Sequence, residues 1–261
     1  MGRVQLFEIE DQAWCPKAIR DAATDYLQFS QRINTPYAPV IPRLRDVVAR
    51  SGGEIVDLCS GGAGPWPSIL HAFAETSTRV RVTLTDKYPN IPAFQAAQAA
   101  FPDAITYVAE PVDATEVPTN LTGARTMFTA FHHFPPPLAR AILADAVRRR
   151  QMIIVCEATE HKTGPILIMF LTPIIALVVT PMIRPFRWSR LLWTYLLPVI
   201  PVMLLWDGIV SCLRTYSPDE LRALTADLGD GYTWEIGQDR SARSLIPVTY
   251  LIGTPASDDL S

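Results

Sequence analysis

From residue 54 onward, short apolar runs alternate with longer segments in which apolar positions recur at helical spacing. Such alternation is typical of βα units and predicts an α/β fold built on a mostly parallel sheet. Strands are predicted at residues 54–58, 79–85, 106–109, 126–130, 152–157, 233–237 and 247–252. Helices are predicted between them at residues 65–74, 92–100, 137–150 and 218–228. The last of these begins with a capping box at Ser217 and Glu220.

The first fifty residues have a different pattern, with prolines at positions 16, 36, 39 and 42 between short helical stretches. Residues 18–31 form the most amphipathic stretch, and residues 44–50 form a second one that leads into a Ser-Gly-Gly turn. We therefore divide the chain into an N-terminal helical cap, residues 1–50, and a main domain, residues 51–261.

One segment of the main domain, residues 161–213, is far more apolar than the rest, and we call it the insert. It has no charged residue at positions 163–183 or 191–206, which is the hydrophobicity of membrane segments. Three structures remain open: a transmembrane hairpin, an interfacial hairpin in one leaflet, and a hydrophobic lid or homodimer interface through residues 163–206.

The basic residues of the insert help to choose between these structures. A spanning hairpin would carry Arg184, Arg187 and Arg190 across the membrane, against the bias that keeps arginine on the cytoplasmic side. Prolines would also interrupt its helices. We favour an interfacial or re-entrant hairpin whose Arg and Trp side chains lie at headgroup level.

Composition narrows the function classes. The chain has 261 residues, of which 49% are hydrophobic, and a formal net charge of −3, so it offers no basic field for nucleic acid. Its four cysteines are scattered and it has only four histidines, which indicates neither a zinc site nor a disulfide framework.

The N-terminus lacks a signal-peptide pattern. We expect a cytoplasmic protein without a metal, at most peripheral at the cytoplasmic membrane face.

The residues that point to chemistry follow the first three predicted strands. The first strand ends at Asp57 and leads into a loop of small residues, 59–64, before a helix begins. Such a loop lets backbone approach a ligand closely, although a tight turn without a ligand has the same pattern. Asp86 ends the second strand, where a Rossmann-type fold places an acid on the ribose hydroxyls. Asp113 follows the third strand, where a carboxylate or its neighbouring backbone could read an adenine edge, although an ordinary turn aspartate has the same position.

Five segments in this order, residues 57–64, 83–87, 112–115, 129–134 and 153–158, resemble the class I S-adenosylmethionine-dependent methyltransferases. The resemblance spans roughly residues 54–254 and implies a Rossmann-like seven-stranded sheet with an antiparallel last hairpin. It implies S-adenosyl-L-methionine as the cofactor, held through the loop, the ribose acid and the adenine acid. The cofactor-binding residues expected from it are Asp57, Cys59, Gly61, Gly62, Asp86, Lys87, Asp113, Ala114 and Phe131.

The loop departs from the family pattern at two positions. The family usually has glycine at alternate loop positions, which here are Cys59, Gly61 and Ala63. A nicotinamide-dependent dehydrogenase is the natural competitor, but the loop lacks the GxGxxG spacing that such enzymes need. A second alternative, from another class, is a membrane-peripheral protein that keeps a nucleotide-binding fold without turnover.

The remaining candidates concern the acceptor. His132 and His133 follow the fourth strand, where either imidazole can serve as a general base or simply cap the strand. Asp207, Ser211 and Arg214 share one helical face after the apolar runs, where they either bind an acceptor's polar head or form a structural Asp–Arg pair. Tyr37 in the cap is a further pocket candidate. Together with the insert, these residues predict methyl transfer to a lipophilic or membrane-associated small molecule.

Overall fold

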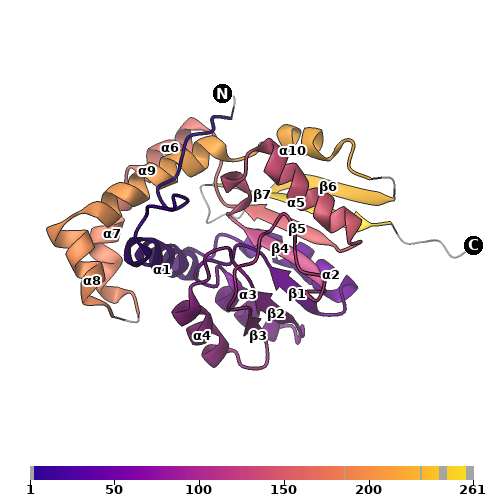
Figure 1. The fold of residues 1–261 in the computed structure, drawn as a ribbon, viewed down its shortest axis with the longest axis horizontal. Helices are drawn as coiled ribbons and strands as arrows, with labels where there is room; N and C mark the ends of the chain where they lie inside the picture. Colours follow the sequence, from indigo (N-terminus) through magenta and orange to yellow (C-terminus); the bar gives the residue numbers. More distant parts are fainter. Residues whose placement is uncertain (1–2, 185, 230, 241–245, 257–261) are drawn as a thin grey trace, which may run out of the picture.

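The computed structural model describes residues 3–184, 186–229, 231–240 and 246–256 (Figure 1). Its seven strands form one sheet in the order β3-β2-β1-β4-β5-β7-β6. Strand β7 runs antiparallel to both of its neighbours, β5 and β6, and the other described strand pairs are parallel. The strands are β1 Glu54–Asp57, β2 Arg81–Leu84, β3 Ile105–Tyr107, β4 Ala124–Phe128, β5 Ile153–Glu157, β6 Tyr232–Asp239 and β7 Val248–Pro255. The predicted fold class and the antiparallel last hairpin are confirmed.

Proline marks the start of most helices around the sheet, because its fixed φ suits the first turn and its missing N–H costs no helical hydrogen bond there. The capping box also forms, since the Glu220 amide donates to Ser217 Oγ and the Ser217 amide donates to Glu220 Oε2. Proline lies in the first turn of five helices: α2 Ile41–Arg50, α3 Trp66–Ala74, α4 Ile91–Ala100, α5 Pro136–Arg148 and α10 Pro218–Thr225.

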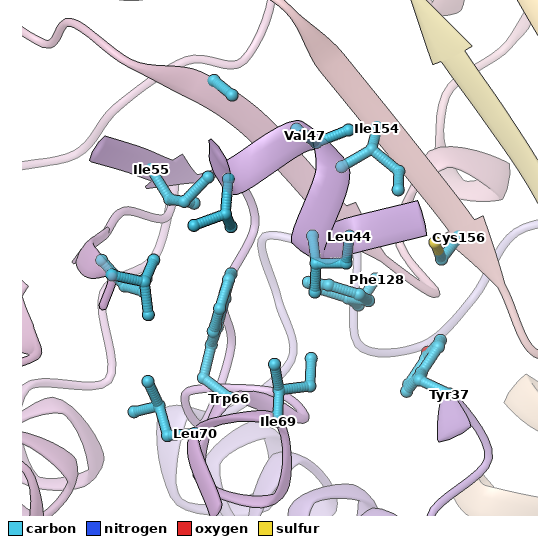
Figure 2. Close-up of a cluster of buried hydrophobic side chains, with 14 of the residues drawn as sticks. Tyr37, Leu44, Val47, Ile55, Trp66, Ile69, Leu70, Phe128, Ile154 and Cys156 are labelled. Carbon is cyan, nitrogen blue, oxygen red and sulfur yellow. The ribbon is translucent and has the colours of Figure 1, made fainter. Parts of the chain in front are cut away.

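The sheet has a hydrophobic core on each face, because successive strand residues point to opposite sides. In β1, Ile55 packs into the first core with α2 and α3, and Val56 packs into the second core with α5. In the first core the rings of Trp66 and Phe128 meet edge to face, with centroids 5.7 Å apart (Figure 2). This doubly covered sheet fixes the carboxyl ends of the strands at one edge.

The N-terminal fifty residues divide between two cores. Helix α2 packs in the first core beside β1. Helix α1, Lys17–Asn34, packs instead in a third core with the insert, through Ile19, Ala23 and Tyr26. The segment predicted as one helical cap therefore has two structural roles, and α1 is the part that reaches the insert.

The insert folds into a bundle of short helices between β5 and α10, which projects from one side of the sheet (Figure 1). Its described prolines lie in first turns and at breaks, so they delimit helices instead of disrupting them. At the close contact between the first and last helices, a Cβ on Gly208 would lie 2.9 Å from Met169 Sδ. The elements are α6 Thr163–Met169, α7 Thr172–Val179, η3 Thr180–Met182, α8 Trp188–Leu191, the π-helical turn η4 Leu192–Leu196 and α9 Val199–Arg214.

A buried ion pair fastens the insert to α1. The Arg190 guanidinium contacts the Asp25 carboxylate, and both side chains are almost fully buried. Arg187 Nη1 lies 3.8 Å from Asp25 and 3.9 Å from Asp21, one helical turn away. The prediction that Arg187 and Arg190 lie at headgroup level is therefore wrong, because both face the protein. Arg184 is exposed.

We expect Arg190→Gln to destabilise the docking of the insert by about 3–5 kcal/mol, because it leaves the Asp25 carboxylate buried without its partner. Arg184→Gln, which removes an exposed charge from the same segment, should change stability by no more than about 0.5 kcal/mol. Urea unfolding, combined with hydrogen exchange of α1 and α8, measures both. Equal effects of the two substitutions would contradict this attachment.

Candidate functional site

The loop after β1 has several residues in left-handed backbone conformation. Cys59, Gly61 and Ala63 all have positive φ, at 57°, 54° and 75°. In the family that the sequence resembles, glycine usually occupies these alternate positions. Here two of the three residues carry a Cβ, and they still adopt left-handed backbone. Left-handed backbone costs roughly 1–2 kcal/mol for a residue with a side chain. The surrounding contacts must hold this loop in place.

Those contacts begin at Asp57. Its carboxylate is fully buried and accepts hydrogen bonds from Ser60 Oγ and Thr126 Oγ1. Burial, together with the nearby Asp86 carboxylate, raises the pKa of Asp57 to about 6. The Ser60 amide donates to the Thr85 carbonyl at 2.9 Å, which ties the loop to the end of β2. Asp57 therefore holds the loop in position from the end of β1.

Asp86 lies beside the loop at the end of β2. Its two carboxylate oxygens accept the amides of Gly61 and Tyr88, each at 2.8 Å. The side chain is half-buried, and each carboxylate oxygen has a second lone pair for a further donor. Asp86 thus braces the loop and still offers acceptor positions at the sheet edge.

Lys87 and Asp113 join the loops that follow β2 and β3. Lys87 Nζ lies 3.1 Å from Asp113 Oδ2, and Asp113 Oδ1 accepts both the amide and the hydroxyl of Thr115. The hydrogen bonds from Thr115 and the Lys87 ammonium hold the pKa of Asp113 below its ordinary value. The Val112 amide also donates to the Asp86 carbonyl at 2.9 Å. The structure therefore brings the predicted ribose and adenine acids to one edge.

Helix α1 covers the outer side of this loop. A Cβ on Gly62 would lie 3.4 Å from the Thr24 carbonyl oxygen, and a Cβ on Gly61 would lie 3.7 Å from Thr24 Cγ2. The Asn90 amide nitrogen also lies 3.4 Å from Thr24 Oγ1. One side of α1 thus touches the loops after β1 and β2, while the other side carries the insert.

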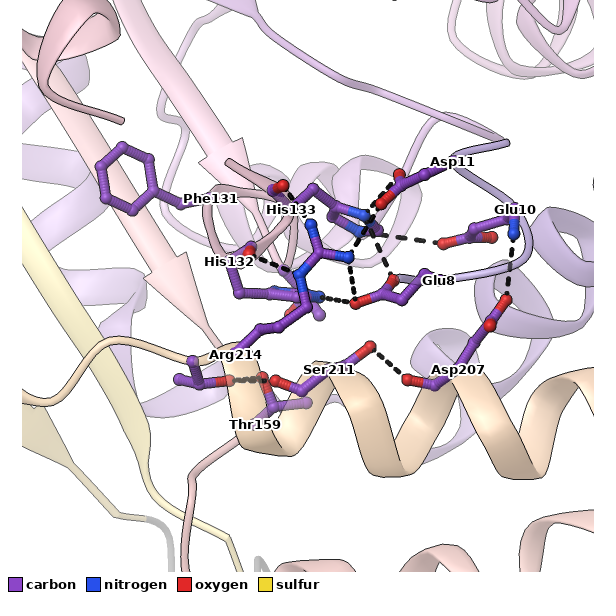
Figure 3. A network of polar contacts seen from close by, with 12 residues as sticks. Glu8, Glu10, Asp11, Phe131, His132, His133, Thr159, Asp207, Ser211 and Arg214 are labelled. Carbon is purple, nitrogen blue, oxygen red and sulfur yellow. Dashed lines mark hydrogen bonds and ion pairs between the residues drawn. The ribbon is translucent and has the colours of Figure 1, made fainter. Parts of the chain in front are cut away.

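Two predicted cofactor residues do not face this edge. The Phe131 side chain is fully buried in the second core, 5.4 Å from the Tyr216 ring, and it points away from the polar residues around it (Figure 3). Ala114 is also buried in the second core. The Phe131 ring therefore does not reach this edge, because the core between β4 and α5 takes it, and the cofactor role of Phe131 stays a prediction.

The two candidate catalytic histidines lie in a buried polar cluster (Figure 3). His132 Nδ1 is 2.7 Å from Glu157 Oε2, and its Nε2 faces Glu8 Oε1 at 3.6 Å. The other Glu157 oxygen accepts the Phe131 amide at 2.7 Å. Both ring nitrogens of His132 therefore face carboxylates of the protein.

His133 is surrounded by acids of the N-terminal segment. Its Nδ1 lies 2.8 Å from Asp11 Oδ1 and 3.2 Å from Glu8 Oε2, and its Nε2 lies 3.8 Å from Glu10 Oε1. Burial alone lowers the pKa of His133, but these carboxylates outweigh it and raise the value to about 10. His133 is then a cation at neutral pH. These contacts argue against the predicted general base, because a protonated imidazole cannot accept a proton.

Arg214 completes the cluster. Its guanidinium lies 2.9 Å from Asp11 Oδ2 and 3.2 Å from Glu8 Oε1, and it donates to the carbonyls of His132 and His133. Glu8, His132 and His133 place donor atoms within 4.8 Å of one another, a spacing that suits a metal ion. The Arg214 guanidinium already supplies a positive charge to Glu8, so we interpret the group as an ion-pair cluster.

The predicted Asp207–Arg214 pair does not form. Asp207 instead accepts the amides of Ile9 and Glu10, at 2.7 and 3.2 Å. Burial raises the pKa of Asp207 to about 7. Ser211 donates to the Asp207 carbonyl one turn away. The polar face of α9 therefore binds the N-terminal segment of the protein itself, and its side chains are not left free for an acceptor.

Tyr37 also has a partner within the chain. Its ring is buried in the first core, 5.0 Å from Phe128, and its hydroxyl forms a hydrogen bond with Thr129 Oγ1 just after β4. Burial keeps the pKa of Tyr37 well above its ordinary value. The Tyr37 hydroxyl is therefore not exposed to an acceptor, and its predicted role in acceptor binding gains no support.

The sequence analysis did not identify the acids that surround His132 and His133. Glu8, Glu10 and Asp11 lie close together in a segment without helical or strand periodicity, so no pattern placed them against the histidines. Glu157 was included only as the end of a predicted strand. The one available signal was the excess of acids beside an otherwise apolar N-terminus.

The cluster makes stability depend on pH. A histidine whose pKa is raised from 6.5 to about 10 contributes stability that is complete below pH 6.5 and is lost as the pH rises toward 10. We expect the stability advantage of the native protein over His133→Gln to be largest below pH 6.5 and to shrink steadily from there to about pH 9.5. Urea unfolding of both proteins across this range measures it. An advantage that stays constant would show that His133 is not charged in the folded state.

Comparisons with known proteins bear on the fold. No protein-family model matches the chain, and no curated protein matches its sequence. Among solved structures, the CMeT domain of a citrinin polyketide synthase has a TM-score of 0.54 at 12% identity, covering 96% of this chain and 60% of that one. PigF, solved with SAH, has a TM-score of 0.53 at 14% identity, covering 94% and 62%. PhzM, a pyocyanin biosynthetic protein, has a TM-score of 0.50 at 14% identity, covering 88% and 62%.

The chain thus spans about three fifths of the length of each of these structures. At such low identity the likeness concerns the fold. The strand order, with its antiparallel β7, agrees with the resemblance to class I methyltransferases that the sequence motifs carry.

Proposed function

We propose that this protein transfers a methyl group from S-adenosylmethionine to a lipophilic small-molecule acceptor. The observation that carries the proposal is the loop after β1, which keeps left-handed backbone at Cys59, Gly61 and Ala63 beside the Asp86 carboxylate. Left-handed residues with side chains are costly and cluster at ligand sites. The solved structure of PigF with SAH, which shares the fold, supports the same choice of cofactor.

The residues at the sheet edge fit an adenosyl group. Asp86 keeps a lone pair on each carboxylate oxygen for a ribose hydroxyl, and the Lys87–Asp113 pair at the same edge supports the proposed adenine side of the site. When bound, S-adenosylmethionine supplies an electrophilic methyl group. The protein's contribution is then mainly to align the acceptor and exclude water.

The histidine cluster restricts the choice of acceptor. Because the carboxylates around His133 keep its imidazole protonated at neutral pH, this residue does not offer a free base. We infer that the acceptor reaches the site as a nucleophile that needs no proton removed by His133. The exposed apolar side chains of the insert, which packs on α1, favour a lipophilic molecule.

The cofactor proposal is tested by calorimetric titration with S-adenosylhomocysteine. We expect binding by the native protein and a weakening of about 10- to 100-fold in Asp86→Ala, because charge-assisted hydrogen bonds contribute about 1.5–3 kcal/mol. Asp103→Ala, which removes an exposed carboxylate from the turn before β3, is the matched control. It should bind as the native protein does.

Two results would count against this site. The first is undiminished binding by Asp86→Ala, and the second is tighter binding of a nicotinamide dinucleotide than of S-adenosylhomocysteine. The second would favour the dehydrogenase alternative.

A further inference from the structure

The insert carries most of the exposed apolar surface of the described chain. Seventeen of the twenty-five exposed large apolar side chains in the described residues lie between positions 167 and 206. Three of the most exposed are Trp188 at 78%, Leu196 at 74% and Val178 at 66%. Soluble monomers rarely expose a contiguous apolar patch of this extent. Something must cover this surface, which we call the outer face of the insert.

The apolar stretch of the insert exposes little charge. Residues 163–206 contain no acid and three arginines. Arg187 and Arg190 point inward to α1, so Arg184 is the charged residue that this stretch exposes. Protein interfaces keep a polar rim and are about two-thirds apolar even in homodimers. The outer face lacks such a polar rim, because residues 163–206 contain no acid and Arg184 is the charged side chain that the described part of this stretch exposes, and this favours lipid over a second protein surface.

Aromatic side chains lie where the outer face meets more polar parts of the molecule. Trp188 packs edge to face with Phe186 beside Arg184. At the opposite end, Trp206 donates its indole N–H to the Phe7 carbonyl and packs against the Phe7 ring, which extends the face into the N-terminal segment. Indole rings prefer the boundary between water and hydrocarbon. Their placement fits the headgroup level of a bilayer.

Length and hydropathy alone would allow the insert to cross a membrane. Residues 163–182 have a mean hydropathy of 2.2 over a helical window that is only 17% buried, and the following pair of helices is bent by 78°. The attachment to α1 opposes crossing, because it would require the buried Arg190–Asp25 pair and the third core to separate. The same α1 lies on the loop after β1, so the insert is held beside the sheet edge.

We propose that the outer face of the insert docks on the surface of a lipid bilayer, with its helices lying in the plane of the membrane and not spanning it. The proposal is independent of methyl transfer, since it rests on exposure, charge and packing alone. Docking would place α1 and the candidate site next to the membrane. Apolar burial drives it, and Arg184 adds a single basic contact.

Flotation with phosphatidylcholine vesicles tests this docking. The native protein should float with the vesicles, and Val178→Asp and Leu196→Asp should each reduce the bound fraction at least tenfold, because they place a charge in the outer face. Leu138→Asp on α5 is the matched control, since Leu138 is also exposed but lies outside the insert. It should float like the native protein.

The dependence on lipid charge provides a second test. One exposed arginine contributes about 1 kcal/mol near an anionic surface, which is about fivefold in affinity. Adding phosphatidylglycerol should therefore strengthen binding only about fivefold, and Arg184→Gln should abolish that gain.

Three outcomes would overturn the proposal. Native protein that ignores vesicles and sediments as a dimer would assign the outer face to a second copy. Equal flotation of Leu196→Asp, Leu138→Asp and the native protein would assign lipid binding to another surface. Protein that resists extraction from vesicles by sodium carbonate, with Trp188 accessible from the lumen, would show a spanning insert. Calorimetric binding of S-adenosylhomocysteine stays measurable in each case, so a failure here is distinct from a failure of the proposed cofactor site.

Discussion

One buried cation, Arg214, holds together the segments on which the candidate site depends. Its guanidinium binds acids of the N-terminal segment and carbonyls of the turn after β4, and it is itself the last residue of α9. Two acids in a buried place are unfavourable without a countercharge. Arg214 and the protonated His133 supply that charge. The N-terminal segment is therefore fixed against the sheet edge although it forms no regular element before α1.

Helix α1 connects the N-terminal segment to the loop after β1 and to the insert. Thr24 contacts the glycines of the loop after β1, while Asp25 receives Arg190 of the insert. The loop after β1, with its costly left-handed backbone, is thus held by Asp57 and covered by α1. The insert, the N-terminal segment and this loop form one connected assembly at the carboxyl edge of the sheet. In the function proposed above, the acceptor and the cofactor meet at this edge.

The strands of the sheet and the four helices predicted between them could be found because each has a local signal, whereas the separate helices of the insert could not be told apart in one long apolar stretch. Apolar runs gave the strands to within three residues, and prolines and the Ser217 capping box gave the helix starts. The acids that end β1 and β2 could be placed because parallel strands share one carboxyl edge. The acidic partners of Arg214 and Arg190 could not be predicted, because the Arg214–Glu8 and Arg190–Asp25 pairs each join segments more than 160 residues apart. Helical spacing suggested Asp207 for Arg214, but tertiary packing gave each a different partner.

The most direct measurement supplies the protein with S-adenosylmethionine labelled in its methyl group together with a total lipid extract. After incubation, the lipid and aqueous fractions are separated and assayed for label. The account predicts label in an organic-soluble product that depends on native protein and is lost in Asp86→Ala. Protein that binds S-adenosylhomocysteine but transfers no label to any fraction would contradict it, and would leave a nucleotide-binding fold without turnover.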